Sequence, residues 1–259
     1  MIRRPPRSTL SSSSAASDVY KRQAFNTPYV TNYLRYPGFR YYPVVGVSWS
    51  QAMDYCRWRT EAVNKQRALE YFGEEDYIDG DIPPIESGIF LPEFRLPTEA
   101  EWEYACRSGT ETPYSFGDEI DQLHDFAWFK ENSNESYQKV GTKKPNPWGI
   151  HDMHGNVSEW TLDKHEVRAY QHLKDSIVKN PYNQPIKTYP RVVRGGSWMN
   201  SDFKLRSASR QPSSKQWKKQ DPQIPRSLWW HTDAQFVGFR IVRPFKTPTT
   251  NQQIQYWEK

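Results

Sequence analysis

The sequence predicts an α+β domain with little regular secondary structure, and three observations support this prediction. Two segments begin with a helix-capping box and continue with apolar side chains at three- and four-residue spacing. Turn-forming residues dominate between residues 108 and 150. The other candidate elements are short runs of β-branched and aromatic residues, which are typical of strands. Two helices followed by loops and short strands indicate the α+β class.

Capping boxes locate the two helices. The first helix is expected to begin at Ser48, whose side chain can accept from a helical amide while Gln51 reaches back. The second is expected to begin at Thr98, with Glu101 closing the box and Pro97 blocking extension backwards. The apolar faces comprise Trp49, Ala52, Met53, Cys56 and Val63 in the first helix, and Trp102, Ala105 and Cys106 in the second.

Strands and loops fill the remaining chain. Short strands are expected at residues 43–47, 192–194, 205–208 and 236–242. Residues 73–94 are acidic, carry Gly and Pro and show no period, so they are expected to form a loop within a longer insertion at 59–94.

The two ends of the chain are expected to lie outside the domain. Residues 1–23 are basic and rich in serine, as a transit peptide would be, but they resemble a translated sequencing-adapter peptide more closely. We therefore exclude them from the fold and expect the genuine N-terminus to be missing. The polar stretch 247–259 is expected to be a tail.

Excluding the N-terminal stretch changes the interpretation of the charge. It holds five basic residues and one acidic residue, which leaves 30 basic and 29 acidic residues elsewhere. The net charge of +5 for the whole chain therefore does not indicate a nucleic-acid partner. No run approaches the roughly 18 apolar residues of a membrane span.

Five sequence blocks together resemble the formylglycine-generating enzyme, or sulfatase-modifying factor, family. The blocks are PVVGVSWSQAMDYCRW (43–58), RLPTEAEWEYACRSG (95–109), NPWGIHDMHGNVSEW (146–160), RVVRGGSW (191–198) and GFRIVRP (238–244). The resemblance implies a C-type-lectin-like fold with little secondary structure. It also implies one domain over residues 24–246, truncated at its N-terminus.

The same resemblance implies the loss of the catalytic site. Active members oxidise a substrate cysteine to formylglycine with copper and oxygen, using two cysteines shortly after the Gly-Gly-Ser motif. Thiolates hold Cu(I) where oxygen ligands do not. Here Asn200 occupies the first cysteine position, and the second falls near Ser201 and Asp202. Ser158 replaces a pocket tryptophan, although the pocket serine is kept as Ser197. We therefore expect no copper and no oxidase activity, as in a pseudoenzyme.

The two cysteines of the chain are expected to be free. Cys56 and Cys106 are too few for a disulfide framework and lack metal-ligand spacing, so buried inert thiols are expected. In secreted members of the resembled family the matching cysteines pair with positions that are Ile241 and Ser207 here.

A calcium loop is the one ion site that the resemblance retains. It implies Ca²⁺ ligation by the side chains of Asp152 and Glu159 and the backbone carbonyls of Gly155 and Val157. Hard oxygen ligands in a tight loop suit Ca²⁺, and a solvated acidic turn is the alternative. The family's other calcium loop has no clear counterpart near residues 125–128.

Other charged and ligand-type residues have simpler interpretations. His151 and His154 have H-x-x-H spacing, but no motif supplies a third ligand for a transition metal. Structural ion pairs are expected from Arg206, Arg210 and Arg240 to Glu99, Glu101, Glu103 or Glu159.

These observations leave more than one function open. The first is a non-oxidase binding or structural module with a protein or peptide partner. The insertion at 59–94 resembles the gliding-motility, type IX secretion lipoprotein branch of the family, which acts at the bacterial cell envelope. The C-terminal stretch 220–244 resembles generic members from environmental bacteria instead. The alternatives are a formylglycine-generating oxidase with an altered site, and the C-terminal part of an ergothioneine-synthase-like iron enzyme. An extracytoplasmic location (periplasm, cell envelope or secreted) is implied by the resemblance alone.

Overall fold

The computed structural model describes residues 33, 37–84, 87–171, 178, 180–218 and 234–244. The expected tails at 1–23 and 247–259, and the outer ends of the expected domain at 24–246, lie outside these ranges. The helices are η1 (Pro37–Phe39), α2 (Trp49–Phe72), α3 (Glu99–Arg107), η3 (Ile120–Gln122), α4 (Leu123–Phe126), η5 (Asp202–Leu205) and η6 (Lys215–Lys218). The strands are β1 (Ser158–Lys164), β2 (Arg191–Arg194), β3 (Gln211–Pro212) and β4 (Val237–Gly238). No helix in the described ranges is long and apolar enough to cross a membrane.

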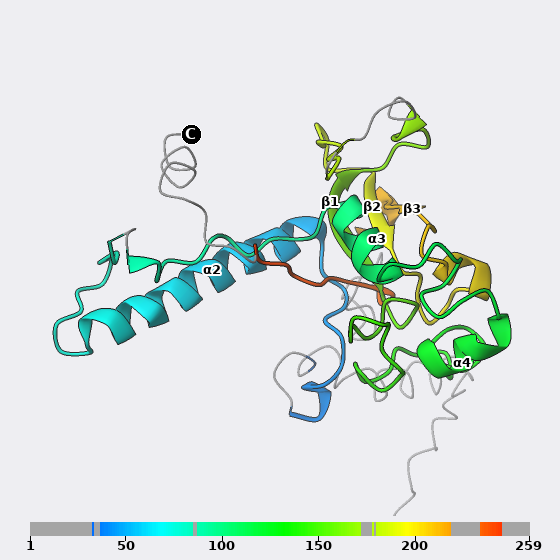
Figure 1. Cartoon of the computed structure of the whole chain (residues 1–259), viewed down its shortest axis with the longest axis horizontal. Helices are drawn as coiled ribbons and strands as arrows, with labels where there is room; N and C mark the ends of the chain where they lie inside the picture. Colours follow the sequence, from blue (N-terminus) through cyan, green and yellow to red (C-terminus); the bar gives the residue numbers. More distant parts are fainter. Residues whose placement is uncertain are drawn as a thin grey trace, which may run out of the picture.

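Both predicted helices are confirmed, together with their capping boxes. Ser48 Oγ accepts from Gln51 N at 3.1 Å while the Gln51 side chain accepts from Ser48 N at 2.8 Å. Thr98 and Glu101 form the same reciprocal pair at the start of α3. The α2 helix continues for 24 residues, so the first part of the expected insertion at 59–94 is helical. In Figure 1 the C-terminal half of α2 and the loop after it project away from the sheet as an arm.

A small mixed sheet forms the centre of the fold, in the order β3-β2-β1-β4. Strands β1 and β2 are antiparallel, with Glu159 opposite Arg194 and Trp160 opposite Val193. Strand β4 lies parallel to β1 on its other side. With helices packed on this short sheet, the predicted α+β class is confirmed.

The strand predictions are only partly confirmed. The strand expected at 192–194 lies in β2. Of the strand expected at 236–242, only β4 and an isolated bridge between Arg95 and Val242 form. The strand expected at 43–47 is wrong, because Pro43 lacks an amide and Gly46 has φ 69. The strand expected at 205–208 is also wrong, since η5 ends at Leu205 and the chain then turns.

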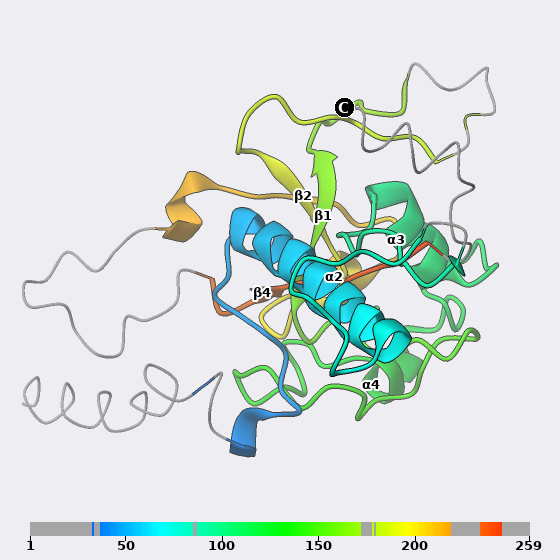
Figure 2. The ribbon, with the colours of Figure 1, turned by 90° about the vertical axis from the view of Figure 1, so that its left-hand side faces the viewer.

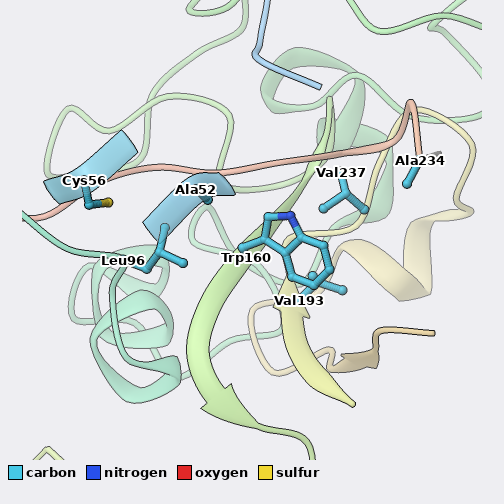
Figure 3. Packing of buried hydrophobic residues seen from close by; sticks show 7 residues of the cluster. All are labelled: Ala52, Cys56, Leu96, Trp160, Val193, Ala234 and Val237. Carbon is cyan, nitrogen blue, oxygen red and sulfur yellow. The ribbon is translucent and has the colours of Figure 1, made fainter. Parts of the chain in front are cut away.

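The strand β1 was not predicted, and it separates two differently built layers. Trp160 belongs to the apolar cluster between the sheet and α2, with Ala52, Leu96 and Val193 around it (Figure 3). Figure 2 shows α2 in front of these strands. The next residue back, Glu159, instead accepts from Trp102 Nε1 of α3 at 2.7 Å. Neighbouring strand residues point to opposite faces, so α2 and α3 lie on opposite sides of the sheet.

Candidate functional site

A tight turn after β2 carries the position expected for the first copper-binding cysteine. Gly195 and Gly196 have φ values of 89° and 70°, which glycine adopts without strain. The Asn200 side-chain oxygen then accepts from both the amide and the hydroxyl of Ser197, at 2.9 Å each. Asn200 N donates to Ser197 O at 2.9 Å, which closes the turn. Asn200 is therefore a turn-capping residue that holds the fully buried Ser197.

The other lost catalytic positions also have local structural roles. Ser201 precedes η5, and its carbonyl accepts from Lys204 N at 3.0 Å. The carbonyl of Asp202 accepts from Tyr114 Oη at 3.1 Å. Ser158 is 1% exposed, and its hydroxyl has no hydrogen-bond partner among the described residues.

The two thiols lie in separate parts of the interior. Cys56 is in the cluster under α2, against which Ile241 packs, and burial raises the pKa of its thiol to about 11. Cys106 is in the cluster under α3, where burial raises its pKa to about 12. Both are free, as predicted. Cys106 Sγ lies 3.6 Å from Ser207 Oγ, so the position implied for its disulfide partner is directly beside it.

The predicted calcium loop brings two carboxylates close together. Asp152 Oδ2 accepts from Gly141 N at 2.7 Å, and Asp152 itself has φ 58. Burial, and next to it the Glu159 carboxylate, raise the pKa of Asp152. Glu159 accepts from Trp102 Nε1 and from Arg240 Nη2, both at 2.7 Å. The negative charge of Glu159 is thus already balanced by an arginine.

The two remaining predicted ligands are held by the fold itself. Gly155 has φ 100, and a Cβ atom there would lie 2.3 Å from Trp128 O, so only glycine fits. Gly155 N donates to Gly195 O at 2.9 Å, which ties the loop to the turn after β2. Val157 is 7% exposed and packs in a cluster with Val45 and Tyr137.

The chemistry of this donor set fits a calcium ion in part. From the described residues, one oxygen of Asp152 accepts no hydrogen bond and Glu159 Oε1 accepts only one, so both have acceptor capacity left. No group of three or more His, Cys, Asp or Glu side chains suited to a metal occurs in the described ranges. That finding does not test a loop with two carboxylates and two carbonyls. The calcium loop stays a prediction.

The H-x-x-H pair is not assembled as a metal site. His154 is 3% exposed; its Nδ1 lies 2.8 Å from Leu205 O, and its Nε2 accepts from Ser115 N at 3.1 Å. These partners fix the proton on Nδ1 and occupy both nitrogens. Burial lowers the pKa of His154 to about 4, so the ring is neutral near pH 7. His151 is exposed and is bonded to Lys143 O instead.

Buried ion pairs lie around α3. The predicted pairs from Arg210 to Glu99 and from Arg240 to Glu159 are confirmed. The pair predicted for Arg206 is wrong: its Nε donates to Phe203 O at 3.0 Å, and it meets no carboxylate in the described residues.

Arg194 is the residue that sequence reasoning missed. It has a fully buried side chain paired with Glu103, and its Nε lies 3.6 Å from Glu99 Oε1. The signal was an arginine directly after two buried valines in a strand. A cation in that place needs carboxylates on the element that covers it.

The geometry defines an α+β domain with this turn, this loop and little regular structure. Comparison with known proteins gives its family. The family model of the sulfatase-modifying factor enzyme 1-like domain matches residues 21–245, so the chain belongs to that family. Its fold is accordingly the C-type-lectin-like fold. A solved structure, Treponema denticola variable protein 1, agrees with a TM-score of 0.53 at 25% identity, covering 80% of this chain and 73% of that one.

Curated relatives within this family carry different names. The serine/threonine-protein kinase pkn1 of Chlamydia pneumoniae is 30% identical over 175 residues, which cover 67% of this chain and 22% of that protein. The formylglycine-generating enzyme of Mycobacterium tuberculosis is 33% identical over 141 residues, 46% of each chain. The chain thus spans less than half the length of either relative, and the family alone does not assign an activity.

Proposed function

We propose that this chain is a non-oxidase binding or structural domain that acts with a protein or peptide partner at the bacterial cell envelope. The observation that carries the proposal is the state of Asn200. The residue at the first copper position is an amide whose oxygen is committed to Ser197. Copper(I) prefers soft thiolate ligands, which an amide does not supply.

The remaining thiols do not replace the missing pair. Both have raised pKa values, so they are neutral thiols near pH 7, whereas the thiolate is the metal ligand. They also lie in the clusters under α2 and under α3, on opposite faces of the sheet. The two sulfur atoms therefore cannot bind the same metal ion.

A direct assay separates this proposal from an oxidase with an altered site. The purified chain is incubated with a CxPxR peptide and Cu(I), and the peptide is analysed by mass spectrometry. We expect no formylglycine above a heat-killed control. Product above that control, lost in Asn200→Ala, would overturn the proposal.

We also propose that the loop from Asp152 to Glu159 binds Ca²⁺ as a structural ion. The half-buried Asp152 carboxylate, whose pKa is raised, supports this, because a cation beside it would offset the cost of burying its charge. The side chains of Asp152 and Glu159 and the carbonyls of Gly155 and Val157 would hold it.

Thermal melting tests the calcium proposal. Ligand at about 100 times its dissociation constant stabilises the folded state by about 2.7 kcal/mol, so Ca²⁺ should raise the melting temperature. Asp152→Asn should abolish the rise, whereas Asp125→Asn, an exposed carboxylate paired with Lys144, should keep it. An unchanged melting temperature with Ca²⁺ in the wild-type chain would show that the assignment is wrong.

A further inference from the structure

Two exposed apolar surfaces of opposite charge lie far apart on the molecule. The first, which we call the acidic tip, is the end of the arm that follows α2. Ile78 is 71% exposed and Ile82 is 64% exposed. Glu74, Glu75 and Asp76 beside them are exposed and form no ion pair within the described part of the chain. Exposed isoleucines rimmed by charge are typical of a contact surface.

Hydrogen bonds of its own hold the acidic tip in shape. Ile78 N donates to Asp81 Oδ2 at 3.1 Å, and Asp81 N donates back to Ile78 O at 2.9 Å. Lys65 from α2 pairs with Asp79 at 2.6 Å. Ile78 is therefore presented outward by an ordered turn, which reduces the entropy lost when a partner binds.

The second surface, which we call the basic patch, lies around η5. Met199 is 48% exposed and Phe203 is 50% exposed. Lys204 Nζ lies 5.2 Å from the centre of the Phe203 ring, and Arg206 Nε donates to Phe203 O. Lys204 and Arg206 are exposed and pair with no carboxylate among the described residues. Asp202, in the same short helix, is half-buried.

The two surfaces lie at opposite ends of one molecule. Leu205 of η5 packs with Leu123 of α4 in one buried cluster. Figure 1 places α4 at one end of the view and the arm at the other. The acidic tip of a molecule is thus out of reach of its own basic patch.

The two surfaces carry opposite charge, and both expose apolar side chains. We propose that the acidic tip of one molecule docks on the basic patch of another. The isoleucines contact Met199 and Phe203, and the tip carboxylates meet Lys204 and Arg206. Such a head-to-tail contact uses two different surfaces, so it produces open chains or rings rather than a closed symmetric dimer. This association is independent of whether the domain retains any oxidase activity.

The contact is small, so we expect it to be weak. Small interfaces give affinities from about micromolar to millimolar. Rim charges steer the encounter and make it dependent on salt. Sedimentation velocity at about 100 µM, within that affinity range, is the suitable measurement, at low and at high salt.

Two variants and their mixture test the proposal. The tip variant is Ile78→Ser with Ile82→Ser, and the patch variant is Lys204→Glu with Arg206→Glu. The wild-type chain should form species larger than a dimer, less so in high salt, and each variant alone should be monomeric. Mixed, they should form only a heterodimer, because the patch variant keeps an intact tip and the tip variant keeps an intact patch. Ile186→Ser, at a 91% exposed site outside both surfaces, should behave as wild type.

Three results would overturn the proposal. If the wild-type chain stays monomeric at every concentration, the proposed contact between copies does not form. The acidic tip is then a surface for a different protein. Self-association that survives in either variant places the interface elsewhere. Failure of the mixture to form a heterodimer, with both variants folded by circular dichroism, rules out the head-to-tail geometry.

Discussion

The two faces of the sheet bury their side chains by opposite means. Under α2 the buried residues are apolar, and Trp160, Val193 and Ala52 meet there. Under α3 the same two strands bury Glu159 and Arg194, which are opposite each other in the register. The apolar face gains from removing hydrocarbon from water. The charged face is held by partners that must all be present, because a buried charge without a partner is costly.

The strand β1 contains this contrast within seven residues. Trp160 and Leu162 pack toward the α2 cluster, while Glu159, Thr161 and Asp163 alternate with them. Asp163 accepts from Glu99 N at 2.6 Å at the start of α3. An alternating polar and apolar strand normally leaves its polar side in water. Here a helix covers that side, so alternation alone does not tell which face is buried.

The largest expected effects compare the two faces by the loss of one buried side chain from each. Trp160→Ala should cost about 4 kcal/mol by removing a buried aromatic ring. Arg194→Met should cost about 3 kcal/mol, since Glu103 keeps Arg107 and Glu99 keeps Arg210 as partners. Denaturant unfolding measures both losses; an Arg194→Met chain as stable as the wild type would contradict the need for every partner on the charged face.

His154 makes the α3 side sensitive to acid. The pKa of His154 falls from an unfolded value near 6.5 to about 4 on folding. Between these two values the unfolded chain binds a proton at His154 and the folded chain does not. The stabilisation is fully present above about pH 6.5 and is lost as the pH falls toward 4, up to about 3 kcal/mol. In His154→Gln this slope should disappear from unfolding curves measured across that range. The raised pKa of Asp152 acts in the opposite direction, which makes the difference between variant and wild type the quantity to compare.

A disulfide should strengthen the α3 side alone. Ser207→Cys places a second sulfur beside Cys106, because Cys106 Sγ and Ser207 Oγ are 3.6 Å apart. Closing so long a loop should stabilise the oxidised chain by about 2 kcal/mol. The test is the unfolding free energy with and without a reductant. Ser209→Cys, two residues further along, is the matched control and should show no such difference. If the unfolding free energy of Ser207→Cys is the same with and without a reductant, as in the wild type, the predicted geometry is contradicted.

The smallest effect compares the two helix caps. Ser48→Ala and Thr98→Ala should each cost about 1 kcal/mol by removing the cap. The loss at Thr98 should be the larger, because its hydroxyl also donates to Asn180 at 2.8 Å. Melting temperatures of the two variants decide this order. An equal loss would mean that the contact with Asn180 adds nothing.

Local signals were enough for the helices and the family, but not for the charged layer. Both capping boxes were readable, since every atom involved lies within four residues. The Gly-Gly-Ser motif was recognised through the family resemblance, and the loss of the thiol at Asn200 followed from it. Strand β1 and Arg194 were missed because their partners are far away in sequence: Glu103 lies 91 residues before Arg194. The strand expected at 205–208 also depends on distant residues, and among the described residues no strand lies beside it to pair with it.

The pairing of β1 with β4 also sets an order of events during synthesis. Arg240 follows Glu159 by 81 residues. At a translation rate of 5–20 residues per second, roughly 4–16 s pass between the two. During that interval Glu159 has no arginine to pair with, and the strand that will cover β1 on one side does not yet exist. The nascent chain can form α2 and α3 early, but the interior beneath α3 closes only when the last part of the domain leaves the ribosome.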